Sequence, residues 1–138
     1  MVQSSQVNDY FRHPRHVGSI PADAADVGTG RVESPGHGDV ARLQVRVEEA
    51  TGVIQEARFK AYGCSFAIAS ASFVADQVMG RTLVSALTIT ADEIGEKLSL
   101  PATKQYCAQL AYDAIRAAIA DYETKRDAKA HLTTEDER

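Results

Sequence analysis

The chain has 138 residues, a formal net charge of −4, 44% hydrophobic residues, 25% charged residues and two cysteines. This length and composition are typical of a single soluble domain, and the acidic balance gives no electrostatic case for binding nucleic acid. No apolar stretch approaches the length of a membrane span, and the first residues lack a signal-peptide pattern, so we expect a cytoplasmic protein with reduced thiols.

The predicted elements begin with a short amphipathic helix over residues 4–12, which Pro14 ends. A glycine-rich stretch over residues 17–38 follows, with at most a short strand near "GTGRVE". Alternating apolar and polar residues predict two strands, over residues 39–48 and 53–62. Because the link between them is short, we expect an antiparallel hairpin.

The C-terminal half of the chain is predicted to be helical. Apolar stripes at helical spacing and helix-ending residues place helices at residues 65–79, near 82–87, near 91–97 and over about 102–127. We expect one domain over residues 1–128, followed by a charged, disordered tail over residues 129–138.

Residues with distinctive chemistry lie at three separate places. The alternation that buries Leu43 also places His37 and Asp39 on the inward side of the strand. Cys64 lies at the start of one predicted helix and Cys107 near the start of the last. Exposed amides and the helix dipole favour a thiolate there. Two cysteines, one histidine and one aspartate match the donor number of a tetrahedral metal site.

Each of these residues also has a purely structural interpretation. Buried free cysteines are common and inert, an aspartate before a strand is commonly a turn residue, and a histidine between glycines is commonly a loop residue. The chain has no CxxC or HxxxH pair. Only the convergence of three segments therefore favours a metal or thiol site, and the pattern alone leaves both interpretations open.

The sequence resembles the iron–sulfur cluster assembly scaffolds of the IscU type, which also occur as the N-terminal domain of NifU. The resemblance is carried, in the family's order and spacing, by "VNDYFRHPRHVGS", "GDVARLQVRV", "ARFKAYGCSFAIASAS" and "LPATKQYCAQLAYDAIRAAIADYETKR". It implies an α+β fold with a small antiparallel three-stranded sheet, helices packed on one face and a long C-terminal helix. The metal site of such a fold lies at one exposed end.

The resemblance also implies a function, which is that of a scaffold and not of an enzyme. Such a scaffold accepts persulfide sulfur, binds iron, and forms and transfers a [2Fe-2S] cluster; Zn(II) binds at the same residues. The implied partners are a PLP-dependent cysteine desulfurase, apo iron–sulfur client proteins and dedicated Hsp70/J-protein chaperones, with a homodimer left open and no nucleic acid or membrane. Leu100, Pro101 and Lys104 match the family's chaperone-recognition segment.

The resemblance assigns four residues as metal and cluster ligands, with the last also the persulfide acceptor: His37, Asp39, Cys64 and Cys107. His37 stands where the family has its first cysteine, and Tyr106 stands where the family has a histidine. A phenol of pKa about 10 is no ligand at neutral pH, so we expect Tyr106 to cover the site or to donate a hydrogen bond. Near a helix N-terminus and Lys104, the Cys107 thiol is predicted to ionise readily.

Two alternatives follow from the departures at these positions. Imidazole suits zinc, and replacing a thiolate by it makes a cluster site less negative. The first alternative is therefore a zinc-binding sulfur acceptor or desulfurase regulator without a stable cluster. The second is a degenerate interaction module without metal.

Overall fold

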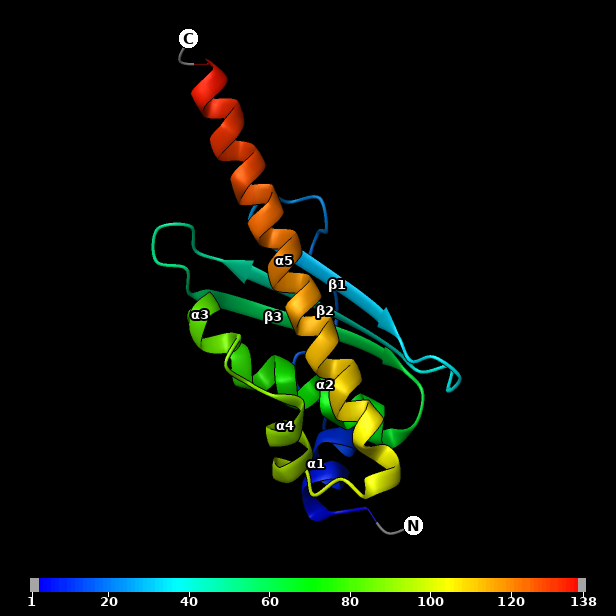
Figure 1. Ribbon diagram of the computed structural model, residues 1–138. Helices are drawn as coiled ribbons and strands as arrows, with labels where there is room; N and C mark the ends of the chain where they lie inside the picture. Colours follow the sequence, from blue (N-terminus) through cyan, green and yellow to red (C-terminus); the bar gives the residue numbers. More distant parts are fainter. Residues whose placement is uncertain (1–2, 137–138) are drawn as a thin grey trace.

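Three strands and a set of helices packed against them make up the protein, shown in Figure 1 as a computed structural model that describes residues 3–136, with side chains described for residues 3–129. The elements in chain order are α1 (Ser5–Arg12), β1 (Val27–Glu33), β2 (Val40–Val47), β3 (Ile54–Tyr62), α2 (Ser65–Val78), α3 (Leu83–Ala86), α4 (Ala91–Lys97), the 3-10 helix η1 (Ala102–Lys104) and α5 (Gln105–Asp136). The strands pair antiparallel in the order β1-β2-β3. The predicted α+β class with its three-stranded sheet and long C-terminal helix is confirmed.

The short helices begin where side chains satisfy amide groups that have no partner within the helix. Ser4, Thr82 and Thr90 each accept a hydrogen bond, at 3.1 Å, from the amide three residues further on. These caps define the starts of α1, α3 and α4. All three helices lie where the sequence predicts them.

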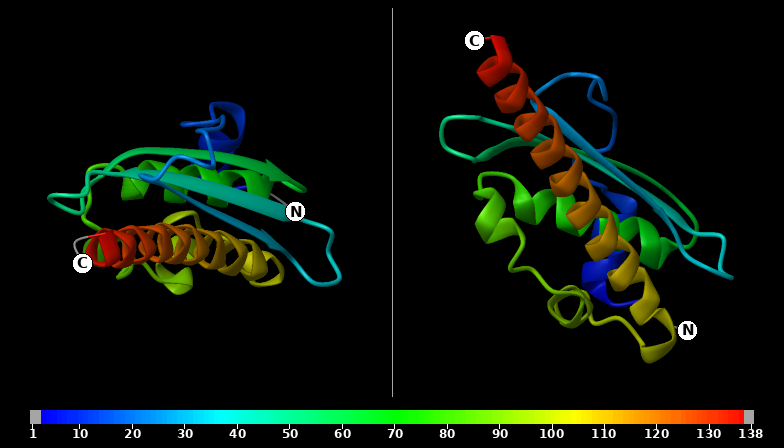
Figure 2. Two further views of the ribbon diagram at one scale, coloured as in Figure 1. Left: turned by 90° about the horizontal axis from the view of Figure 1, so that it is seen from above. Right: turned by 45° about the horizontal axis from the view of Figure 1, so that its top comes forward.

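Helices α2 and α5 cover one face of the sheet, as the two views of Figure 2 show. The central strand β2 turns Ala41, Leu43 and Val45 toward these helices, and all three side chains are fully buried. Phe59, which pairs with Leu43 from β3, and Ala114 of α5 belong to the same apolar cluster. The predicted packing of helices on one face is thus confirmed.

Strand β1 packs with its backbone directly against α5. A Cβ atom on Gly28 would collide with the carbonyl oxygen of Ala118, and Gly30 lies equally close to the helix. At the outer edge of β1, the amide of Thr29 donates to the carboxylate of Asp121 at 2.9 Å. Glycines carry no alternating pattern, so the sequence predicts at most a short strand here. Contact with α5 accounts for the full-length strand.

The chain between α1 and β1 covers the free edge of β3 and then crosses the other face of the sheet. The carbonyl of His16 accepts from the amide of Phe59 at 2.9 Å, and the amide of Gly18 donates to the carbonyl of Phe59 at 3.0 Å. Further on, the buried side chain of Gln44 accepts from the amide of Ile20 and donates to its carbonyl, both at 2.8 Å. The glycine-rich stretch is therefore tied to the sheet by hydrogen bonds.

Helix α5 continues to Asp136, so residues 129–136, predicted to be disordered, are helical in the structure; residues 137–138 of that predicted tail lie outside the described residues. Once a helix has formed, each further residue adds a hydrogen bond at little entropic cost. Because no glycine or proline interrupts the helix, charge alone does not end it.

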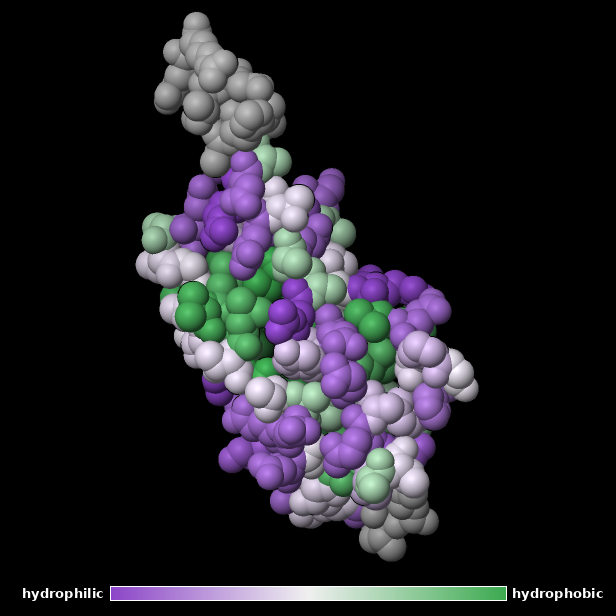
Figure 3. Space-filling view, in the orientation of Figure 1, coloured by the Kyte–Doolittle hydropathy of each residue, from purple (hydrophilic) through white to green (hydrophobic). Residues whose placement is uncertain are grey.

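The surface visible in Figure 3 is mostly polar, with hydrophobic residues gathered over α3 and beside α5. Val84 in α3 is 77% exposed, and Leu87 after it is 37% exposed. Within the described part of the chain, no helix combines the length and the apolar composition needed to cross a membrane.

Candidate metal centre

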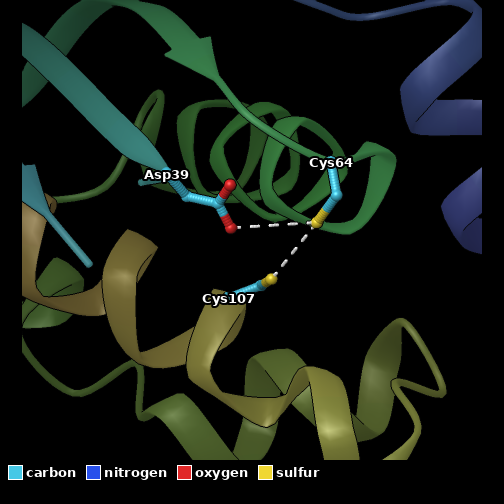
Figure 4. Close-up of side chains that lie close together, drawn as sticks. All are labelled: Asp39, Cys64 and Cys107. Atoms are coloured by element: carbon cyan, nitrogen blue, oxygen red, sulfur yellow. Dashed lines mark hydrogen bonds between the residues drawn. The ribbon is translucent and has the colours of Figure 1, made fainter. Parts of the chain in front are cut away.

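Three elements bring one donor atom each to the same end of the molecule. Asp39 directly precedes β2, Cys64 is the N-cap residue of α2, and Cys107 lies in the first turn of α5. Their donor atoms all lie within 4.8 Å of one another. The Sγ atom of Cys64 lies 3.8 Å from Sγ of Cys107 and 3.9 Å from Oδ2 of Asp39 (Figure 4).

The backbone around Asp39 and Cys64 holds the carboxylate in place. Asp39 is 5% exposed, and its carbonyl accepts from the amide of Ser34 at 2.8 Å. A Cβ atom on Gly63 would collide with the Asp39 carboxylate. Gly63 also has φ +143°, a conformation that side chains disfavour. The glycine before Cys64 thus lets the aspartate reach the two sulfur atoms.

The two thiols differ in access to solvent. Cys107 is fully buried, whereas Cys64 is partly exposed. Burial raises the pKa of the Cys107 thiol to about 12, and the neighbouring Cys64 sulfur adds to the increase. The prediction that Cys107 ionises readily is therefore wrong for the metal-free chain. Lys104, expected to assist, has its ammonium 5.5 Å from the ring centroid of Phe66 and 5.7 Å from that of Tyr106.

Tyr106 reaches into the site from the residue before Cys107. Its hydroxyl lies 3.9 Å from Sγ of Cys64. Burial, followed by a hydrogen bond to Asp39 and the nearby Cys107 sulfur, raises the pKa of Tyr106 above its usual value. The phenol is therefore neutral beside the three donor atoms, and its hydrogen bond to Asp39 is one of the two roles that the sequence leaves open for this position.

His37 is exposed and lies outside the group of three donors. It stands between Gly36 and Gly38, whose φ angles are +78° and +77°. Its ring stacks on the ring of Tyr106, with centroids 3.8 Å apart and planes 10° from parallel. Of the four predicted ligands, the structure thus brings Asp39, Cys64 and Cys107 together and places His37 on the far side of Tyr106.

The predicted chaperone-recognition residues lie just before α5. Leu100 is largely buried, and its amide donates to the carbonyl of Gly95 at 2.9 Å. Pro101 is the N-cap residue of η1 and Lys104 its last residue.

Sequence reasoning missed the stacking of His37 on Tyr106, because no local pattern links residues so far apart in the chain.

Comparison with known proteins places this geometry in a family. The family described as "NifU-like N terminal domain" matches residues 2–129. "Iron-sulfur cluster assembly scaffold protein IscU" of Escherichia coli (strain K12) is 48% identical over 129 residues, covering 94% of this chain and all of the relative. The protein of the same name from Azotobacter vinelandii is 48% identical over 126 residues, covering 91% of this chain and 98% of the relative.

Solved structures support the same assignment at the level of the fold. A putative iron–sulfur cluster assembly scaffold protein for the SUF system, from Fervidobacterium islandicum AW-1, matches with a TM-score of 0.66 and 19% identity, over 84% of this chain and 95% of that one. A NifU-like protein (N-terminal) from Brucella abortus matches with a TM-score of 0.66 and 18% identity, over 88% and 94%. Given the family match along nearly the whole chain and the close relatives, the chain belongs to the NifU-like N-terminal domain family, which the IscU scaffold proteins share.

Proposed function

We propose that the protein is a scaffold for iron–sulfur cluster assembly and not an enzyme. It binds iron, accepts persulfide sulfur, and builds and transfers a [2Fe-2S] cluster. The observation that carries the proposal is the meeting of Asp39, Cys64 and Cys107 within 4.8 Å. Relatives that are 48% identical over most of both chains bear the name of such scaffolds.

The chemistry of the donor set fits thiophilic metal ions. Two thiolates are soft ligands that suit iron–sulfur clusters and zinc, and a carboxylate adds an oxygen donor. A [2Fe-2S] cluster takes four protein ligands, of which Asp39, Cys64 and Cys107 supply three. We propose His37 as the fourth: it lies one ring away, on a loop flanked by glycines, and becomes available when it leaves the ring of Tyr106.

Cys107 remains our proposed persulfide acceptor. Because its thiol is fully buried, a desulfurase reaches it only after a local movement uncovers it. The partners we propose are a PLP-dependent cysteine desulfurase, apo client proteins, and Hsp70/J-protein chaperones that contact the segment of Leu100, Pro101 and Lys104. Two free cysteines match a reducing compartment such as the bacterial cytoplasm.

Anaerobic reconstitution tests the proposal. The protein is incubated with Fe(II), cysteine and a cysteine desulfurase, and ultraviolet–visible and Mössbauer spectra are recorded with iron, zinc and sulfide analysis. A [2Fe-2S] spectrum is expected from the unmodified chain and is expected to disappear in Cys64→Ala, Cys107→Ala and Asp39→Ala. The matched control is Asp127→Ala, an exposed aspartate on α5, which is expected to keep the cluster. Unchanged metal content in both cysteine variants contradicts the proposal.

A zinc-binding sulfur acceptor or desulfurase regulator is the second candidate. The specific observation in its favour is that three donors converge while His37 lies outside their group, stacked on Tyr106. Three protein ligands and one open position are typical of reactive zinc sites. Stoichiometric zinc without any cluster spectrum in the same experiment supports this candidate. Absence of both metals supports the degenerate interaction module.

A further inference from the structure

The two cysteine sulfurs lie in direct contact with each other within the group of three donors. They are the only cysteines of the chain, both are free, and their Sγ atoms lie 3.8 Å apart. Figure 4 shows the two side chains pointing toward each other across the gap between the start of α2 and the start of α5. This separation brings the two sulfurs into van der Waals contact, and it is also about the spacing of two thiolates around a tetrahedral zinc ion.

We propose that this pair lets the metal-free protein release accepted sulfur as sulfide without an external reductant. The inference rests on the proposed function, which supplies a persulfide on one of the two thiols. The thiol of Cys64 attacks Sγ of the Cys107 persulfide. The bond between Sγ and the terminal sulfur breaks, a Cys64–Cys107 disulfide forms, and the terminal sulfur leaves as hydrogen sulfide with the two thiol protons. The terminal sulfur keeps the electron pair of the broken bond and so gains one electron, Sγ of Cys64 loses one, and Sγ of Cys107 stays at the same oxidation level.

The geometry favours this internal step over attack by thiols from solution. Thiols attack sulfur–sulfur bonds through direct contact between sulfur atoms, and groups held near contact distance react as if at very high concentration. Cys107 is fully buried, so small thiols reach its Sγ atom more slowly than the neighbouring Cys64 does. Cys64 is already in contact with it. Closing the sulfur pair from 3.8 Å to a disulfide bond of about 2.05 Å requires only a short movement.

The step has a consequence for the metal site. A disulfide removes both sulfur donors and leaves Asp39 as the one remaining member of the three-residue group. Sulfide release by this route and metal retention therefore exclude each other, and a metal ion held by Cys64 keeps its sulfur from attacking the persulfide. In this chain, metal must enter before sulfur for both to be retained.

A test of the inference uses the purified metal-free protein and no iron or desulfurase. Under anaerobic conditions the protein is loaded with glutathione persulfide, freed of excess reagent and incubated. Released sulfide and the Cys64–Cys107 disulfide are quantified by colorimetry and by peptide mass spectrometry. We expect equal amounts of sulfide and disulfide, at a rate unchanged by dilution, and at least about a tenfold slower release when zinc is bound first.

The variant Cys64→Ser is expected to keep its persulfide and to release sulfide at least about tenfold more slowly. Cys107→Ser, which lacks the proposed acceptor, is expected to take up little persulfide, and far-UV circular dichroism checks the fold of both variants. A second measurement, on the unmodified chain, uses the thiol oxidant diamide, which is expected to form the intramolecular disulfide directly. A stable persulfide in the unmodified chain, sulfide release without disulfide, or failure of diamide to link the thiols overturns the inference. Because cluster assembly is measured separately, a chain that builds clusters yet keeps its persulfide rejects only this inference.

Discussion

At the scale of single residues, a position without a side chain determines how the ligands meet. Gly63 leaves space that the Asp39 carboxylate fills, and through it Asp39 approaches Cys64. Tyr106 fills the space on the other side, between the ligand atoms and the exposed ring of His37. The site is thus shaped as much by its neighbours as by its ligands.

Replacing Gly63 by alanine tests this dependence. The new Cβ atom collides with Asp39, so Gly63→Ala is expected to weaken Co(II) binding at least about tenfold, as changes next to ligands commonly do. Binding is measured from the thiolate-to-cobalt absorption. The control is Gly52→Ala, because Gly52 also has a positive φ, +72°, but has open space around it. Equal affinity in both variants contradicts the collision.

Burial of Cys107 predicts a difference in reactivity between the thiols. With the pKa of Cys107 raised to about 12 by burial, this thiol stays protonated in the folded chain from neutral pH to well above the ordinary range of cysteine. Iodoacetamide at pH 9 is therefore expected to label Cys64 first and Cys107 slowly, as followed by mass spectrometry.

Equal labelling of both thiols in urea is the control for this experiment. A folded protein in which Cys107 reacts as fast as Cys64 contradicts the prediction.

The raised pKa of Cys107 also predicts how the stability of the fold varies with pH. The folded state holds the proton more tightly than the unfolded state, so stability is full below the unfolded pKa, near 9, and falls as pH rises from about 9 to 12.

At the scale of elements, α5 acts as the support for the first strand. Its Ala118 and Ala114 backbone lies against the glycines of β1, and its Asp121 accepts from the edge amide of Thr29. Lys125, one turn further along, donates to the carbonyls of three residues in the loop leading into β1 and at its start: Ala22, Ala24 and Val27. A single helix therefore provides both a metal ligand and the anchor of an edge strand.

The change Lys125→Met measures this anchor. It removes three hydrogen bonds from a charged donor, at 2.5, 3.2 and 2.7 Å, and is expected to lower the free energy of unfolding by about 1.5–3 kcal/mol. Urea unfolding gives the value. The control Arg31→Met removes only an exposed ion pair with Glu33 and is expected to cost less than about 1 kcal/mol. Similar losses in both variants argue against the anchor.

At the scale of the whole molecule, the three proposed ligands lie at the starts of β2, α2 and α5, which also build the core. A metal ion held by all three joins elements that are distant in sequence. Its binding is therefore coupled to the stability of the entire fold and not only to that of the loops.

Zinc is accordingly expected to stabilise the whole chain against heat. At about a hundred times its Kd, zinc adds about 2.7 kcal/mol to the free energy of unfolding, and a chelator removes this gain. Differential scanning calorimetry with and without zinc provides the measurement. Cys64→Ala and Cys107→Ala are expected to lose the effect, whereas a zinc-dependent gain that persists in both variants points to a different site.

The fold was largely predictable from the sequence, because alternation identifies β2 and β3 and capping residues mark α1, α3 and α4. The length of strand β1 was underestimated from the sequence. Its glycines allow a close contact with α5, and no local sequence pattern reveals that contact. Three of the four residues proposed as ligands lie together, as the sequence predicts. The fourth, His37, has a stacking partner far along the chain, and for Cys107 the effect of burial outweighs that of the helix N-terminus.

The two borders of the sheet have a consequence for behaviour at high concentration. Unpaired edges of β-sheets invite other chains to add strands, which leads to aggregation or to domain swapping. Here the Thr29 amide on the outer edge of β1 is capped by Asp121, and β3 is covered near Phe59 by the segment from His16 to Gly18. The protein thus pairs part of each border without closing a barrel, and detachment of the segment beside β3 would leave the amide and carbonyl of Phe59 open to a strand from another chain.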